Sequence, residues 1–355
     1  MRLLLGEMKN NIKLNADERA YRSVLNYTGI CLLIFLVLIN VMAVPSAIVE
    51  LLENIMPYEM YYTLSQITEI ITYLASFIVP ALILRRFLKR KGLLQPMNLE
   101  FRASGAAWLL VPGAIGINFG VSYLNSLLMS AFGLTDAYSD MVAMSEQPYE
   151  PYQILLLFLL IALVPAICEE FFFRGTILAN LLPFGQGIAI IGSAVLFGLM
   201  HQNPYQLLYT TVAGLMMGYA YVKTRSIWYP TVIHLCNNSL AVLQEVIYTN
   251  GTEAMANAFV LVMNVIMMIV GFGCFAAYLV IDADKGKKKY DGGSFGRAIE
   301  PDEGYAQREV RPENKIRLFF SAGIIVFVVL VALSMLLLMA ILGLLYAENG
   351  GTLSI

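Results

Sequence analysis

The stretch ILLLFLLIALVPAICEEFFFRG, residues 154–175, decides the fold class of this chain. The run 154–166 carries no charge, and Glu169, Glu170 and Arg174 follow it directly. About 20 apolar residues suffice for a helix to cross a bilayer, whereas a charged side chain at the bilayer centre costs at least ~2.5 kcal/mol. The stretch therefore predicts a membrane helix whose three charged side chains have a specific role.

The rest of the chain is similarly apolar. Of its 355 residues, 59% are hydrophobic and 14% are charged, against about 25% charged residues in soluble domains. This composition predicts an all-α fold, a polytopic membrane helical bundle of about nine transmembrane helices. The expected spans are residues 25–44, 66–84, 104–131, 152–182, 184–201, 205–222, 226–247, 256–281 and 318–346.

The positions of lysine and arginine orient these spans. Short cytoplasmic loops are enriched in both residues, and the nine expected spans place every Lys and Arg of the chain toward one side of the membrane. The loops expected on the other side, such as 45–65 and 132–151, contain neither residue. We therefore expect a cytoplasmic N-terminus and a C-terminus outside the cell.

Four regions are expected along the chain. They are an N-terminal three-span region (1–150), a five-span membrane core (151–281), a flexible cytoplasmic linker (282–317) and a C-terminal anchor span (318–355). The polar residues of the spans concentrate between 152 and 247. Glu69 is an exception, and we expect it to face a cavity or a neighbouring helix. The functional site should therefore lie within the five-span core.

The charge of the chain argues against a nucleic-acid partner, and the positions of its cysteines indicate a packing role. The net charge is -2 and the chain has no basic stripe, so nucleic acid is not an expected partner. The lipid bilayer is the expected surrounding. The four cysteines lie one per apolar span without a CxxC pair, as expected for small apolar filler: Cys31, Cys168, Cys236 and Cys274.

The chain's two histidines both fall in the five-span core. Helices that meet at a turn near 183–187 would bring Glu169, about 21 Å from the turn, and His201, about 24 Å from it, to one level. His234 enters the membrane by about 12 Å from its own helix start. The three side chains can therefore meet inside the cytoplasmic leaflet.

Helical spacing assigns faces to these residues. Glu170 and Arg174 are four residues apart and can pair, whereas Glu169 points about 100° away and should have another role. His234 and Asn238 share one face. A buried Glu–Arg pair alone is often a helix clamp, but a carboxylate, two imidazoles and an amide at one depth supply a base and oxyanion donors for attack on a carbonyl.

Pro165 precedes Glu169 by one helical turn. Because proline has no N–H, the carbonyl of Ile161 lacks its usual helical donor. We expect a kink beside the site.

These residues form three spaced motifs: EEFFFR (169–174), FGLMH (197–201) and HLCNN (234–238). In this order on consecutive helices they resemble the CAAX protease and bacteriocin-processing (CPBP, or ABI) family of intramembrane glutamate proteases. The resemblance covers about residues 150–247. It implies a membrane-embedded glutamate-type endopeptidase, and its similarity to bacterial members points to a bacterial plasma membrane.

The resemblance implies four catalytic residues. Glu169 and His201 would activate a water molecule for attack on a peptide carbonyl, while His234 and Asn238 would hold the oxyanion. Three further residues would support the site: Glu170, Arg174 and Phe197. The substrate would be a peptide or a membrane protein. No metal or other cofactor is expected from the resemblance.

Three alternatives stay open at this stage. Two histidines and a carboxylate can bind zinc, although the chain has no HExxH. The fold could serve as a non-catalytic membrane scaffold or a bacteriocin-immunity-type protein. A transporter would also suit buried charge, but the sequence shows no inverted repeat.

Overall fold

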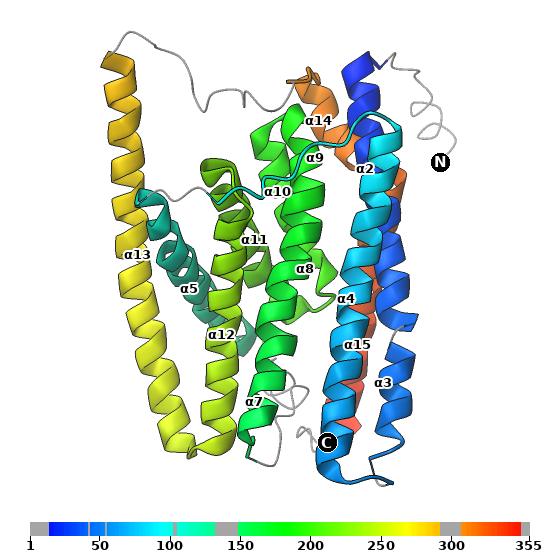
Figure 1. The fold of residues 1–355 in the computed structure, drawn as a ribbon, viewed down its shortest axis with the longest axis vertical. Helices are drawn as coiled ribbons and strands as arrows, with labels where there is room; N and C mark the ends of the chain where they lie inside the picture. Colours follow the sequence, from blue (N-terminus) through cyan, green and yellow to red (C-terminus); the bar gives the residue numbers. More distant parts are fainter. Residues whose placement is uncertain are drawn as a thin grey trace.

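The computed structural model describes residues 14–41, 43–53, 55–101, 105–131, 148–291 and 307–348. These residues contain helices and no strand, and the long helices lie side by side (Figure 1). Six helical stretches are long and apolar enough to cross a membrane. The expected all-α membrane bundle is therefore confirmed, while the count of nine spans and their direction stay predictions.

The N-terminal region forms long helices that extend beyond the expected spans. They are α2 (Ala16–Val41), α3 (Ala43–Glu50), α4 (Tyr58–Arg90), the short 3₁₀ helix η1 (Ala106–Leu109) and α5 (Leu110–Ala131). The apolar runs mark only the middle of α2 and α4, because polar residues continue both helices past the hydrocarbon region. Most of the loop expected at 132–151 lies outside the described residues.

The core opens with one long helical stretch from Pro151 to Phe184. Its parts are α7 (Pro151–Phe158), the π-helical η2 (Leu159–Leu163), α8 (Val164–Phe172), the π-helical η3 (Phe173–Leu178), α9 (Ala179–Leu181) and the 3₁₀ turn η4 (Leu182–Phe184). A capping box between Glu150 and Gln153 starts it. Gly185 ends it with φ of 130°, a conformation that favours glycine.

Three consecutive helices follow this stretch: α10 (Gln186–Met200), α11 (Pro204–Thr224) and α12 (Trp228–Asn250). They occupy the positions of three expected spans, although they are not among the six that meet the length and composition criteria. The GLMMG segment at 214–218 packs closely as expected, since a Cβ on Gly214 would lie 3.0 Å from the Cα of Ala194 in α10.

The C-terminal region consists of α13 (Glu253–Asp291), α14 (Pro312–Phe319) and α15 (Ala322–Glu348). Helical backbone thus extends into both ends of the expected 282–317 linker, and residues 292–306 lie outside the described part. Helix α15 packs closely against α2. A Cβ added to Gly29 of α2 would lie 2.4 Å from the carbonyl carbon of Gly323 in α15. The expected anchor span is therefore in close contact with the N-terminal region.

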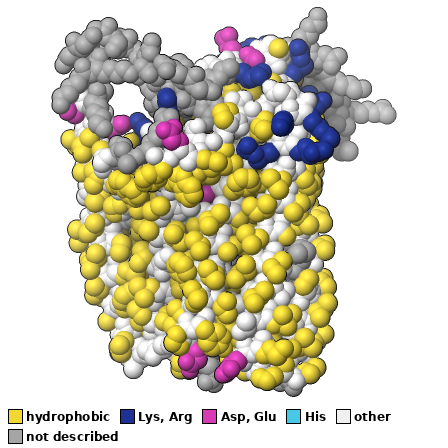
Figure 2. Space-filling model, in the orientation of Figure 1, with side chains coloured by type: hydrophobic (Ala, Val, Ile, Leu, Met, Phe, Trp, Pro, Cys, Tyr) yellow, Lys and Arg dark blue, Asp and Glu magenta, His cyan; other side chains and the backbone are white. Residues whose placement is uncertain are grey.

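Charged side chains gather at the two ends of the bundle (Figure 2). On the face in view, Lys and Arg side chains lie at the end at which α2 begins and α4 ends, acidic side chains lie at both ends, and the sides between them are mostly apolar. This distribution agrees with the direction predicted from the loops, in which α2 begins on the cytoplasmic side.

Candidate active site

A cavity of about 970 Å³ lies between α4, α5, α8, α10, α11 and α12. Its lining includes all four residues predicted to be catalytic: Glu169, His201, His234 and Asn238. They come from two helices, α8 and α12, and from the residue that follows α10, so only the tertiary fold brings them together. The expected convergence of the two histidines with Glu169 is present in the structure.

Glu169 lies in α8 between two π-helical segments and is buried, with 2% of its surface exposed. The hydroxyl of Tyr73, from α4, donates a hydrogen bond to Glu169 Oε1. The other oxygen, Oε2, has no hydrogen-bond partner among the described residues. One carboxylate oxygen is thus held by Tyr73, and the other is a buried acceptor without a donor, in a residue that lines the cavity.

His201 follows directly after the last residue of α10. Its Nδ1 lies 2.9 Å from the carbonyl oxygen of Phe197. Because a carbonyl only accepts hydrogen bonds, Nδ1 carries the proton and donates it. In the neutral imidazole, Nε2 therefore has a lone pair with which it can accept a hydrogen bond.

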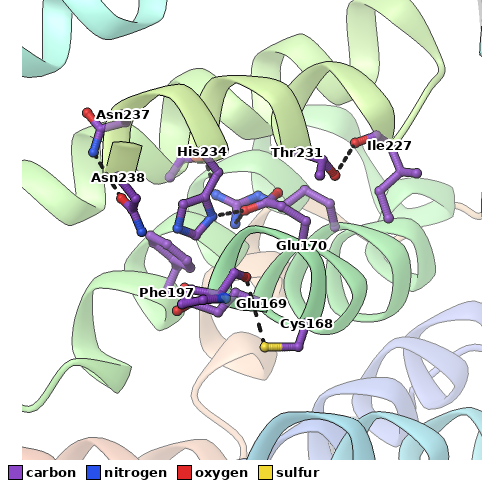
Figure 3. A network of polar contacts seen from close by, with 12 residues as sticks. Cys168, Glu169, Glu170, Phe197, Ile227, Thr231, His234, Asn237 and Asn238 are labelled. Carbon is purple, nitrogen blue, oxygen red and sulfur yellow. Dashed lines mark hydrogen bonds and ion pairs between the residues drawn. The ribbon is translucent and has the colours of Figure 1, made fainter. Parts of the chain in front are cut away.

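Glu170 binds two partners at once (Figure 3). Its Oε1 accepts hydrogen bonds from Arg174 Nη1 at 2.8 Å and from His234 Nδ1 at 3.0 Å. All three side chains are buried. The expected Glu170–Arg174 pair is confirmed, and sequence spacing missed the contact with His234, since that residue lies on another helix.

Arg174 is fully buried and makes two further contacts with neighbouring helices. Its Nη2 donates to the carbonyl oxygen of Gly214 at 3.2 Å, and its guanidinium lies 4.5 Å from the ring centroid of Phe197. The absence of a side chain at residue 214 leaves its carbonyl accessible at this close helix crossing. Arg174 therefore connects α8 and η3 to both α10 and α11.

The Phe197 ring contacts both histidines. It packs edge to face with His201 at 5.1 Å and with His234 at 6.0 Å between ring centroids. These contacts restrict the rotation of both imidazoles. Phe197 thus occupies the supporting position that the motif predicted, although its role in activity stays a prediction.

Asn238 donates the hydrogen bond that the backbone at Pro165 cannot donate, because proline has no N–H. Its Nδ2 donates to the carbonyl oxygen of Ile161 at 2.9 Å, beside the π-helical segment η2. A π-helical segment precedes Pro165, and the expected kink beside the site stays a prediction. Asn238 Oδ1 accepts from Asn237 Nδ2 at 3.2 Å, and Asn237 Oδ1 accepts from Asn118 Nδ2 at 2.9 Å.

The site contains residues that sequence reasoning did not select. Tyr73 and Asn118 come from α4 and α5, outside the motif region, and no spacing in the sequence relates them to the core. Glu69 does line the cavity, as expected. The sequence offered one signal for Tyr73: it follows Glu69 by four residues, and residues four apart share a helix face.

Metal binding was the main chemical alternative. Within the described part of the chain, no three His, Cys, Asp or Glu side chains form a group that could hold a metal ion. The expectation of a reaction without metal stays a prediction.

The sequence of the core matches a known protein family. Residues 151–240 match the family model described as "Type II CAAX prenyl endopeptidase Rce1-like". The matched segment contains all three motifs, so the resemblance to CAAX protease and bacteriocin-processing enzymes is confirmed for this part of the chain.

A curated relative supports the same class. The chain is 26% identical over 183 residues to the "Putative membrane peptidase YdiL" of Bacillus subtilis (strain 168), an alignment that covers 50% of this chain and 70% of the relative. No solved structure gives a significant match to the chain. The family segment, the relative and the apolar helices together identify a membrane protein of a peptidase family.

Proposed function

We propose that this protein is an intramembrane endopeptidase that hydrolyses a peptide bond in a membrane-associated protein or peptide. The observation that carries the proposal is the pair of acceptors in one cavity: Glu169 Oε2, which has no partner among the described residues, and Nε2 of His201. A water molecule bound by both would be oriented and activated. The family match and the relative's name support peptide hydrolysis.

The first step is attack by water. Glu169 takes a proton from the water while the water oxygen bonds to the peptide carbonyl carbon, and His201 Nε2 accepts the second O–H. The carbonyl electron pair moves onto oxygen, which becomes an oxyanion. Tyr73 holds the other oxygen of Glu169 in place, so the carboxylate does not need to reorient during this step.

His234 and Asn238 would stabilise the oxyanion. Since His234 Nδ1 donates to Glu170, its Nε2 can donate to the oxyanion when the ring is an imidazolium, and Glu170 stabilises that charge. Asn238 Nδ2 has two hydrogens, one for Ile161 and one for the oxyanion. Each such donor is worth about 100-fold or more in rate.

The second step breaks the C–N bond. The oxyanion collapses to a carboxyl group, and Glu169 returns its proton to the departing nitrogen, which leaves as an amine. Neither step requires a metal or other cofactor. The proposed location is the plasma membrane of a bacterium, with the cavity accessible to substrates held at that membrane.

The test uses the full-length protein purified in a mild non-ionic detergent. Hydrolysis of a diverse set of internally quenched peptides is measured for the native chain, Glu169→Gln and His201→Ala, with and without a strong chelator. Glu59→Gln is the matched control, because Glu59 lies on α4 but does not line the cavity. We expect at least a 100-fold loss in both site variants, native activity in the control and no effect of the chelator.

Full activity in either site variant would overturn the assignment. The scaffold alternative makes a different prediction in cells. If cells carrying Glu169→Gln release the same membrane and secreted peptides as cells carrying the native chain, and the variant restores every phenotype of a deletion, the protein acts without hydrolysis.

A further inference from the structure

Glu69 is an acidic side chain in the proposed active-site cavity that the mechanism does not use. It lies on α4 exactly four residues before Tyr73, the residue that contacts Glu169. Both Glu69 and Tyr73 line the cavity. Four residues of helix correspond to a rise of about 6 Å, so Glu69 lies one helical turn from Tyr73, the residue that contacts Glu169, on the side away from the basic end of α4.

The charge of the cavity lining is one-sided. Among the described residues that line it, the acidic side chains are Glu69 and Glu169, the histidines are His201 and His234, and none is a Lys, Arg or Asp. In the described part of the chain, no Lys, Arg or His forms an ion pair with Glu69. The protein itself therefore supplies no cation to this carboxylate.

A carboxylate in such surroundings favours a positively charged ligand. Glu69 is half-buried in a bundle of apolar helices, and an ionised group at membrane depth is costly unless it meets water or an opposite charge. A cationic group that enters the cavity would meet Glu69 directly. An anionic group that enters the cavity would meet the carboxylates of Glu69 and Glu169.

We propose that Glu69 is a specificity-determining residue that binds a cationic group of the substrate, an ammonium or a guanidinium. An extended peptide advances about 3.3 Å per residue, so one helical turn places this group about two residues from the scissile bond. The inference rests on the proposed function for the position of that bond, but the binding of a cation by Glu69 does not depend on hydrolysis.

Binding is measured with the full-length Glu169→Gln protein in non-ionic detergent, which removes turnover and the second carboxylate. The probes are fluorescent apolar peptides, acetylated and amidated, in which a single Lys is moved along the sequence, each paired with a norleucine peptide. A peptide with a free N-terminal amine and no Lys tests the other source of an ammonium group.

We expect the best Lys or free-amine peptide to bind about tenfold more tightly than its uncharged partner, a difference of about 1.4 kcal/mol. Adding Glu69→Gln should remove this preference, and Glu69→Lys should shift it to a Glu-containing peptide. Glu59→Gln, on the same helix but outside the cavity, should retain it. Equal binding of charged and uncharged peptides to the Glu169→Gln protein, or a preference that survives Glu69→Gln, would overturn the proposal.

The same peptides separate this inference from the proposed function. In the chain with Glu169 intact, kcat/KM should show the same tenfold preference, which Glu69→Gln should remove and the control Glu59→Gln should retain. If no peptide is cleaved by any variant, hydrolysis fails as the proposed function while the binding result still decides whether Glu69 selects a cation.

Discussion

Asn238 of α12 donates a hydrogen bond to the carbonyl oxygen of Ile161, 2.9 Å away, which is the carbonyl that Pro165 cannot reach with a backbone N–H. The third sequence motif therefore completes the backbone of the helix that carries the first. This contact gives Asn238 a structural role beside its proposed role at the oxyanion. A simple Asn238→Ala variant would combine both effects.

A double substitution separates the two roles. Asn238→Ala should lower stability by about 1 kcal/mol through the lost hydrogen bond and lower activity by about 100-fold through the lost oxyanion donor. Adding Pro165→Ala supplies an N–H to the Ile161 carbonyl, so stability should recover while activity stays low. SDS unfolding in mixed micelles and peptide hydrolysis measure the two effects. Recovery of activity together with stability would assign Asn238 a structural role alone.

Sequence reasoning was most successful where a local pattern determines the outcome. Helical spacing predicted the Glu170–Arg174 pair, because this contact forms within one helix. The helix ends were less accurate, since polar residues extend α4 well beyond its apolar middle. Hydropathy alone carries no information about where such a helix stops.

Contacts between helices could not be predicted in the same way. Tyr73 reaches Glu169 from a helix outside the motif region, and His234 reaches Glu170 from α12. These contacts depend on which helices become neighbours and how they rotate, and a single sequence does not fix either. Helix rise predicted the convergence of the core residues and the motif resemblance supported it, but neither gave information about α4.

Tyr73→Phe tests the contact with Glu169. Loss of the hydroxyl leaves Glu169 Oε1 without its donor, so the carboxylate should be less well positioned, and we expect kcat to fall by about 10-fold to 100-fold with little change in KM. Tyr62→Phe is the matched control on the same helix, because its hydroxyl has no partner among the described residues. Equal kcat values for the two variants would show that the Tyr73 hydroxyl does not serve the reaction.

The buried cluster of Glu170, Arg174 and His234 should dominate the stability of the core. Arg174→Met leaves the Glu170 carboxylate buried without its cation, which should cost about 3–5 kcal/mol. Glu170→Gln combined with Arg174→Met removes both charges and should recover most of that loss. SDS unfolding of the two variants measures the difference. A double variant no more stable than Arg174→Met would contradict the charge-pair explanation.

The close approach of Gly29 and Gly323 tests whether the last helix is a separable anchor. A Cβ added at Gly29 would lie 2.4 Å from the backbone of Gly323, so Gly29→Ala should force α2 and α15 apart and destabilise the protein by about 1–3 kcal/mol. Gly273→Ala, in α13, is the control, since a Cβ there meets no atom within 4 Å. Unfolding in mixed micelles and limited proteolysis measure the effect.

Because α14 connects α15 to the core, with the Phe319 ring against Gly192 of α10, we also expect Gly29→Ala to lower peptide hydrolysis. An independent anchor would instead leave stability and activity at the level of the control.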